Sequence, residues 1–179
     1  MSIDTALLVI DVQVSLIKDA YQGDEVLQNI KHLLERAHVS ATPVIYVQHS
    51  EDPGGELEAN TPGWQIHPLV APREDEVVIQ KASPDSFHLT RLQDELEARG
   101  IKRLVVVGMQ TECCVETTTR RAVSQGYDVL LVSDAHTTFN NKTLTAAQII
   151  AFCNEALNGF WAGEHIVRVR PADEIVFNA

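Results

Sequence analysis

The chain has few cysteines, no long apolar run and no excess of positive charge. Only three cysteines occur in 179 residues, and two of them, Cys113 and Cys114, are adjacent. Neighbouring cysteines cannot form a relaxed bridge, so the sequence does not encode a disulfide framework. No stretch approaches the roughly 20 apolar residues that cross a bilayer. The net charge of −11 opposes phosphate backbones and anionic lipids, so we expect neither nucleic acid nor a membrane as a partner.

The length and composition fit one domain with a single large core. Hydrophobic residues make up 45% of the chain and charged residues 22%, as in ordinary globular proteins. No repeat, linker or low-complexity tract divides the sequence, so we expect residues 1–179 to form one domain. The first residues lack the basic and apolar segments of a secretory signal, which predicts a cytoplasmic protein.

Apolar runs that end in polar residues alternate with helical patterns. The expected strands cover residues 6–12, 44–47, 77–79, 103–108, 129–132 and 166–169. Apolar residues at three-and-four spacing predict helices over 25–39, from Leu89 to the stop at Gly100, over 112–125 and over 146–157. Such alternation implies right-handed crossovers. The expected fold is α/β, a Rossmann-like three-layer sandwich in which a mostly parallel sheet of about six strands has helices on both faces.

A long loop is expected between the second and third strands. Residues 50–73 hold four of the seven prolines, together with Trp64, and show no sustained periodicity. Long connections without regular structure in compact domains are usually functional. We therefore expect this loop to form a wall of a binding site.

Polar residues follow four of the predicted strands. Asp11, His49, Lys81 and the turn that leads to the paired cysteines each come where a strand ends. In an open parallel sheet these ends share one edge, beside the crevice where ligands bind. Asp11 can accept a thiol proton, Lys81 can stabilise an anion, and backbone N–H groups at a helix start can hold an oxyanion. The pattern predicts nucleophilic attack by cysteine on a carbonyl group.

The spacing does not decide which cysteine is the nucleophile. The strand over 103–108 breaks at Gly108, and a helix begins close to Cys113 and Cys114. Helix N-termini are among the environments that lower a cysteine pKa from about 8.5. Adjacent helical residues point about 100° apart, so only one of the two can face the crevice. Cys153 lies on the apolar stripe of the last helix and is predicted to be core.

Short motifs occur in a fixed order along the chain. They are Leu-Leu-Val-Ile-Asp-Val-Gln at 7–13, Gly-Trp-Gln-Ile-His-Pro at 63–68, Lys-Ala-Ser-Pro-Asp-Ser-Phe at 81–87, Gly-Met-Gln-Thr-Glu-Cys-Cys-Val at 108–115, Gly-Tyr at 126–127 and Asp-Ala at 134–135. Together they resemble the isochorismatase-like cysteine hydrolases, a family that contains nicotinamidases, N-carbamoylsarcosine amidases, ureidoacrylate amidohydrolases and isochorismatases. The resemblance covers essentially the whole chain.

The resemblance implies a catalytic set. The family's nucleophile directly precedes a valine, which selects Cys114, and Asp11 and Lys81 match the family's aspartate and lysine. A non-proline cis peptide would fall between Met109 and Gln110, with the oxyanion held by the backbone amides of Gln110 and Cys114. The implied activity is hydrolysis of a small-molecule amide or related C–N bond through a thioester, without a cofactor. Family members are usually dimers or tetramers, so a homodimer or homotetramer is expected.

The chain departs from the family pattern at positions that determine metal binding and the choice of substrate. Nicotinamidases carry an Asp-x-His motif after the second strand, whereas this chain has Val47-Gln48-His49. Only Asp52 and His67 are available as supplements, so we expect no metal site. Residues from strand ends and the loop are candidates for substrate binding: Gln13, His49, Trp64 and Phe87.

Two other activities are consistent with parts of the pattern. An isochorismatase-type hydrolase would act on a vinyl ether, but some such enzymes lack the cysteine that this chain has. A thiol redox protein that uses Cys113 and Cys114 is the alternative from another class, although the chain has no Cys-x-x-Cys motif. Trp161 is a candidate for burial in a subunit interface.

Overall fold

In this computed structural model, which describes residues 4–177, a single sheet contains seven strands. The order across the sheet is β3-β2-β1-β4-β5-β7-β6. The strands are β1 (Thr5–Ile10), β2 (Val44–His49), β3 (Val77–Lys81), β4 (Arg103–Met109), β5 (Asp128–Thr137), β6 (Trp161–Ala162) and β7 (His165–Arg170). The helices are α1 (Val14–Ile17), α2 (Gly23–Val39), α3 (Leu92–Ala98), α4 (Glu116–Ser124) and α5 (Ala146–Leu157), with a π-helical turn (Thr111–Val115) directly before α4.

The strand pairings are parallel except at one edge. Only β6 runs antiparallel, paired with β7 through Trp161 and Ile166. The prediction of about six strands is therefore one short, because a two-residue strand gives no periodic signal. Trp161 is 69% exposed, and its burial in a subunit interface stays a prediction. None of the helices among the described residues has the length and apolar character needed to span a membrane.

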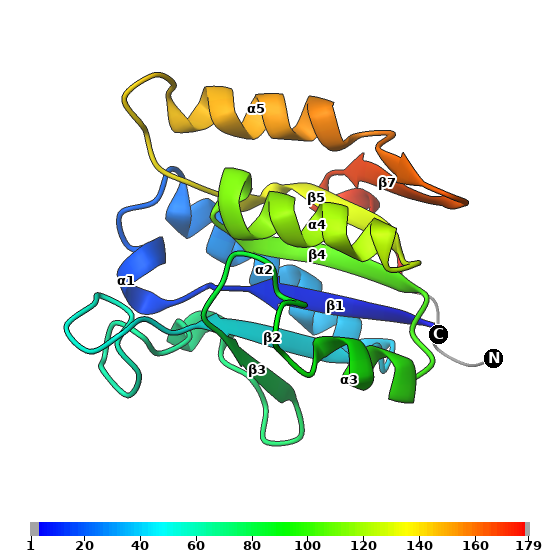
Figure 1. Ribbon diagram of the computed structural model, residues 1–179, viewed down its shortest axis with the longest axis horizontal. Helices are drawn as coiled ribbons and strands as arrows, with labels where there is room; N and C mark the ends of the chain where they lie inside the picture. Colours follow the sequence, from blue (N-terminus) through cyan, green and yellow to red (C-terminus); the bar gives the residue numbers. More distant parts are fainter. Residues whose placement is uncertain (1–3, 178–179) are drawn as a thin grey trace.

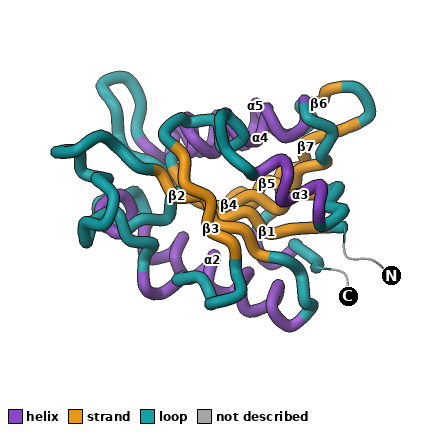
Figure 2. The backbone as a smooth tube through the Cα atoms, turned by 60° about the horizontal axis from the view of Figure 1, so that its bottom comes forward, coloured by secondary structure: helices purple, strands orange, loops and turns teal. Residues whose placement is uncertain are grey.

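Helices cover both faces of the sheet, which confirms the predicted three-layer α/β fold. Alternate residues of β1 enter different clusters: Leu7 and Val9 pack with α2, while Leu8 and Ile10 pack with α3, α4 and α5. Figure 1 shows α4 and α5 in front of the sheet and α2 behind it. Figure 2 shows the same layers from another side, with α2 below the strands. The predicted apolar stripe of α2 is buried throughout, at Val26, Ile30, Leu33, Leu34 and Ala37.

Several element boundaries differ from the sequence prediction, and two of the differences have a local explanation. The helix expected to begin near Leu89 begins at Leu92, and Leu89 is 93% exposed with a φ of +53°. The Thr90 hydroxyl donates to the Ser86 carbonyl and accepts from the Leu92 amide, so a local cap replaces the expected first turn. Strand β5 continues to Thr137 because its pairing with β4 resumes at His136 and Thr137 after a register shift, although Ser133 and Asp134 interrupt the apolar run.

The fold brings the predicted loop to the edge where the functional strands end. Figure 1 shows α1, which follows β1, and the long loop after β2 on the same side of the sheet. The loop has no long regular element, as expected, and contains only a 3₁₀ turn at Pro68–Val70. Gln13 forms an antiparallel bridge with Ile66 and so joins the start of α1 to this loop.

Candidate active site

Lys81 brings the predicted polar residues together. It ends β3, its backbone partner His49 ends β2, Asp11 follows β1, and Cys114 lies in the turn after β4. The Lys81 Nζ atom is 2.7 Å from Asp11 Oδ2, 3.1 Å from His49 Nδ1 and 3.3 Å from Cys114 Sγ. The four strands are consecutive in the sheet and parallel, so their carboxyl ends converge as the topology predicts.

The ammonium of Lys81 is held in place without exposure to solvent. Its side chain has no accessible surface, and Nζ also donates to the Ser83 carbonyl at 2.9 Å. Burial lowers the pKa of Lys81, but the negative charge of Asp11 opposes this effect and the pKa is raised overall. Lys81 therefore stays positively charged. The Ser83 carbonyl is a partner that the sequence analysis missed, since a backbone oxygen leaves no sequence signal.

The backbone conformation and the surroundings of Asp11 suit it as a proton acceptor. Its backbone has a φ of +52°, a region that aspartate tolerates better than most residues. The carboxyl group is buried. Lys81 pairs with Oδ2, and the Cys114 thiol is the other side chain near enough to act as a donor to the carboxyl group. Burial raises the pKa of Asp11, with the positive charge of Lys81 acting in the opposite direction. A buried carboxylate with free lone pairs and a raised pKa is a competent base.

The environment of Cys114 favours the thiol in the resting state. Burial and the negative charge of Asp11 raise the pKa of Cys114, while Lys81 lowers it by a smaller amount. The expectation from the sequence, that a helix N-terminus lowers this pKa, is therefore wrong in direction. Desolvation and a nearby carboxylate outweigh a partial helix charge. The proton must leave the thiol during attack, and Asp11 is the group that can receive it.

The backbone after β4 turns sharply to present Cys114. Gly108 has a φ of +122°, and a Cβ atom there would lie 2.0 Å from the Ile10 carbonyl oxygen, so only glycine fits beside β1. The peptide between Met109 and Gln110 is cis, as the resemblance implied. The Gln110 carbonyl then accepts from the Cys113 and Val115 amides, which closes the π-helical turn. Backbone N–H groups in such a first turn lack intrahelical partners in general.

The contact with Lys81 distinguishes the two adjacent cysteines. Cys114 Sγ touches Lys81 Nζ, whereas the side chain of Cys113 makes no hydrogen bond or ion pair among the described residues. Both thiols are partly exposed, and Cys153 is buried as predicted. All three cysteines are free. The geometry therefore places Cys114 in the polar cluster, where sequence spacing alone left the choice open.

Gln13 and Trp64 make buried hydrogen bonds to the backbone and side chains next to the polar cluster. Gln13 is fully buried, and its amide nitrogen donates to the His49 carbonyl at 2.9 Å and the Trp64 carbonyl at 2.8 Å. Its amide oxygen accepts from the His49 backbone at 3.0 Å. The Trp64 indole donates to the Ser50 hydroxyl at 2.9 Å. These contacts occupy the polar atoms of Gln13, so it holds the strand ends and the loop together.

His49 and Phe87 occupy different surroundings. Burial and the charge of Lys81 lower the pKa of His49, so its Nδ1 is free to accept from the ammonium. Phe87 belongs to the apolar cluster on the α3 and α4 face and stacks on Tyr127 with ring centroids 6.1 Å apart. Of the two, only His49 touches the polar cluster.

Two neighbouring cavities open beside Lys81 and His49. One has a volume of about 440 Å³ and is lined by Ser50, Gln80, Lys81, Ala82, Ser83, His88 and Leu89. The other has a volume of about 420 Å³ and is lined by His49, Ser50, Glu51, Asp52, Pro53, Gly55 and Ala82. They share Ser50 and Ala82. Their size suits a small molecule.

The described residues do not assemble a metal site. No group of three or more His, Cys, Asp or Glu side chains within residues 4–177 is placed to hold a metal ion. His67, a possible ligand in the sequence analysis, accepts through Nδ1 from the Leu69 amide and caps the 3₁₀ turn.

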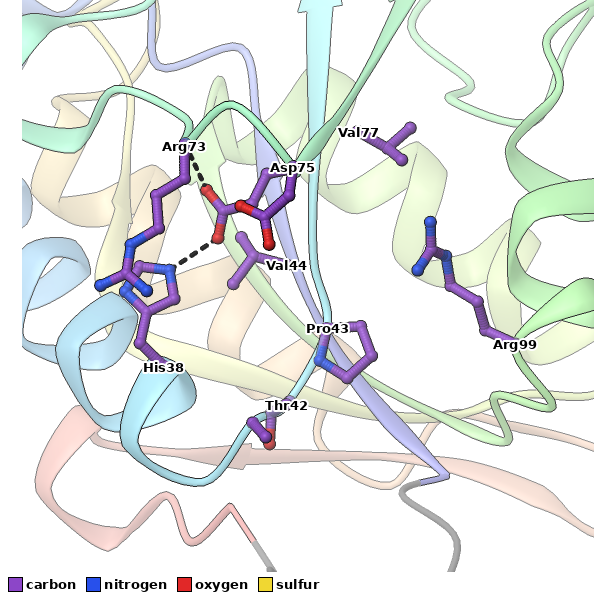
Figure 3. Close-up of a pocket in the computed structure, with 10 residues that line it drawn as sticks. His38, Thr42, Pro43, Val44, Arg73, Asp75, Val77 and Arg99 are labelled. Carbon is purple, nitrogen blue, oxygen red and sulfur yellow. Dashed lines mark hydrogen bonds and ion pairs between the residues drawn. The ribbon is translucent and has the colours of Figure 1, made fainter.

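A further cavity, of about 370 Å³, lies at the opposite ends of β2 and β3. It is lined by residues that include Val44 and Val77, which begin these strands, and by Arg73 and Arg99 (Figure 3). His38 pairs there with Glu76 at 2.6 Å. Because the strands run parallel, this cavity is separated from Cys114 by the length of the sheet. It takes no part in the polar cluster.

Comparison with known proteins identifies relatives over most of the chain. The family model of the isochorismatase domain matches residues 5–153. A streptothricin hydrolase from Streptomyces noursei is 37% identical over 138 residues, and the match spans 75% of this chain but only 55% of that enzyme. An uncharacterised isochorismatase family protein from Bacillus subtilis, YddQ, is 36% identical over 88% of this chain and 93% of its own. The crystal structure of an isochorismatase from Pseudomonas putida superposes with a TM-score of 0.85, at 33% identity over 97% of this chain and 90% of that one.

Proposed function

This chain belongs to the isochorismatase family, and from its site we propose that it is a cysteine hydrolase that cleaves a small-molecule amide or related C–N bond through a thioester. The observation that carries the proposal is the contact of one buried ammonium with both a carboxylate and a thiol. Lys81 Nζ lies 2.7 Å from Asp11 and 3.3 Å from Cys114. A nucleophile beside its base and a fixed cation is the arrangement that covalent catalysis requires.

Acylation begins with proton transfer from Cys114 to Asp11. The thiolate attacks the substrate carbonyl carbon, and the resulting oxyanion accepts hydrogen bonds from the backbone amides of Gln110 and Cys114. The tetrahedral intermediate collapses when the C–N bond breaks, and Asp11 returns the proton to the departing nitrogen. A thioester on Cys114 remains. In other acyl-transfer enzymes, loss of one oxyanion donor costs about 10²–10³ in turnover, which sets the scale for these amides.

Deacylation uses the same groups in reverse. Asp11, now ionised, removes a proton from water as the water attacks the thioester carbonyl. The second tetrahedral intermediate expels the Cys114 thiolate, which takes the proton back from Asp11 and restores the resting thiol. Lys81 stays beside both Asp11 and the sulfur atom through both halves of the cycle, so the negative charge has a cation within reach whichever of the two groups carries it.

The charge of the cavities favours a neutral or cationic substrate. Glu51 and Asp52 line the cavity beside His49, and none of the residues that line either cavity is an arginine. The positive charge of Lys81 is already matched by Asp11. The dicarboxylate of an isochorismatase reaction would meet like charges here. Similarity to a streptothricin hydrolase places streptothricin first among substrates to test.

The test compares wild type with two matched alanine variants. Purified protein is assayed against streptothricin and a panel of small amides, with detection of released amine or ammonia. Cys114→Ala should lose turnover completely, whereas Cys113→Ala should keep most of it, because only Cys114 contacts Lys81. Intact-protein mass spectrometry should show an acyl adduct that Cys114→Ala cannot form. Turnover that survives in Cys114→Ala would exclude the thioester mechanism.

A further inference from the structure

His136 lies outside the polar cluster but contacts the turn that carries Cys114. It belongs to β5, where its backbone partner in β4 is Gly108. The imidazole is buried, and both of its nitrogens have partners. Nδ1 is 2.8 Å from the Thr111 hydroxyl, and Nε2 is 2.9 Å from Asn154 Oδ1. The sequence analysis did not single out His136 or Thr111, because neither is part of a recognisable catalytic pattern.

The surroundings fix which nitrogen carries the proton. The Asn154 amide nitrogen donates to the Ser133 carbonyl at 3.1 Å. This contact turns Asn154 Oδ1 toward the imidazole, so Nε2 of His136 must be the donor. Burial lowers the pKa of His136, which keeps the ring neutral. Nδ1 therefore has a free lone pair, and the Thr111 hydroxyl donates to it.

Thr111 is the residue through which this contact reaches the site. It is buried, it begins the π-helical turn, and it directly follows Gln110. The hydrogen bonds that close the turn, from the Cys113 and Val115 amides to the Gln110 carbonyl, are internal to it. They shape the turn but do not attach it to the sheet. The side chain of Thr111 supplies an attachment to β5 through His136.

We propose that His136 is a positioning residue that holds the Gln110 and Cys114 amides in place for the oxyanion by fixing Thr111. This inference rests on the proposed function. It predicts an effect on the step that forms the oxyanion and little effect on substrate binding, since His136 lines neither of the cavities beside Lys81. A displacement of about 1 Å in a catalytic constellation can cost about 10² in rate.

Two conservative variants of His136 each keep one of the two hydrogen bonds that the imidazole makes. In His136→Asn, the side-chain oxygen reaches the position of Nδ1 and keeps an acceptor for Thr111. In His136→Gln, the longer side chain reaches the position of Nε2, keeps a donor for Asn154 and leaves Thr111 without its acceptor. We expect kcat to fall about 10- to 100-fold in His136→Gln with KM within threefold of wild type. His136→Asn should stay within about fivefold of wild type in both constants.

A reaction of Cys114 that forms no oxyanion provides the second measurement. Alkylation by iodoacetamide, followed at Cys114 by peptide mass spectrometry, should proceed at the wild-type rate in both variants. A kcat in His136→Gln equal to that in wild type would overturn the inference, and so would a parallel loss of alkylation and hydrolysis. If wild type hydrolyses no amide, the proposed function fails, and hydrogen exchange then decides the positioning role. Residues 110–115 should exchange faster in His136→Gln than in His136→Asn, and equal rates would refute it.

Discussion

Replacing Asp11 with asparagine should make Cys114 more reactive toward a simple electrophile while abolishing hydrolysis. Asparagine has nearly the shape of aspartate, so the buried position stays filled. The negative charge that raises the pKa of Cys114 is removed, and the positive charge of Lys81 remains 3.3 Å from sulfur. The thiolate then becomes the natural counterion of the buried ammonium.

The distance between Nζ and Sγ gives the size of the effect. Two unit charges at this separation interact with roughly 5 kcal/mol at an effective dielectric constant of about 20. Burial of the thiolate opposes this attraction and takes up most of it. If only about 1.4 kcal/mol survives, the thiolate population at a fixed neutral pH rises about tenfold. Hydrolysis needs Asp11 to accept and return a proton, and general acid–base groups contribute about 10²–10⁴.

The assay follows alkylation of Cys114 by iodoacetamide between pH 6 and 9, with Cys113→Ala as the background to remove the neighbouring thiol. In the Asp11→Asn variant the rate profile should shift to lower pH, and the rate at pH 7 should rise about tenfold or more. Amide hydrolysis in the same preparation should fall by at least about 10²-fold. A profile that stays in place or shifts to higher pH would refute the reasoning, because it would mean that Asp11 does not hold the thiol in its protonated state.

Three other changes test the surrounding structure. Gly108→Ala should lower the free energy of unfolding by more than about 3 kcal/mol, because its Cβ would meet the Ile10 carbonyl. Gly100→Ala, at a positive φ of +67° and in open space, should cost about 1 kcal/mol in the same urea titration. Gln13→Glu should destabilise by about 2–5 kcal/mol and expose residues 50–73 to proteolysis, since an acceptor replaces the donor to two carbonyls; unchanged cleavage would contradict this. The pKa of His136 is lower in the folded protein than in the unfolded chain, so the free energy of unfolding falls as the pH drops below the unfolded value of about 6.5. The decline in unfolding free energy between pH 7.5 and 5.5 should be smaller in His136→Gln than in wild type. An equal decline in both proteins would argue against a buried neutral ring.

The sequence allowed the site to be located because one topological rule connects distant residues. Asp11, His49 and Lys81 are separated by tens of positions, yet each ends or follows a strand, and parallel neighbours bring such ends together. The identity of the nucleophile needed more than the rule. Helical geometry allowed either Cys113 or Cys114 to be the nucleophile. The family pattern in the sequence favoured Cys114, and in the structure Cys114 is the one that contacts Lys81.

The features that the sequence could not provide depend on burial and on contacts between loops. The pKa of Cys114 goes in the direction opposite to the one expected from its helix position, since the surrounding burial is set by the packing of several segments. Gln13 was a candidate for substrate binding, and its amide is instead occupied by the backbone around His49 and Trp64. The role of a polar side chain near a site is ambiguous in the sequence, because the same amide or hydroxyl group can bind a substrate or hold the backbone in place.

Burial raises the pKa values of Asp11 and Cys114, and the negative charge beside Lys81 raises the pKa of that ammonium. In the resting state the buried cluster contains one carboxylate, one ammonium and a neutral thiol. When the proton passes from Cys114 to Asp11, the cluster contains one thiolate, one ammonium and a neutral carboxyl group. The net charge is zero in both states, so activation of the nucleophile moves a negative charge from one side of Lys81 to the other and does not transfer a new charge into the protein interior. The desolvation that makes either anion alone unfavourable is thus nearly equal on both sides of the transfer. An enzyme built this way needs no free thiolate at rest, and its nucleophile is protected from electrophiles and oxidants until a carbonyl group is bound beside it.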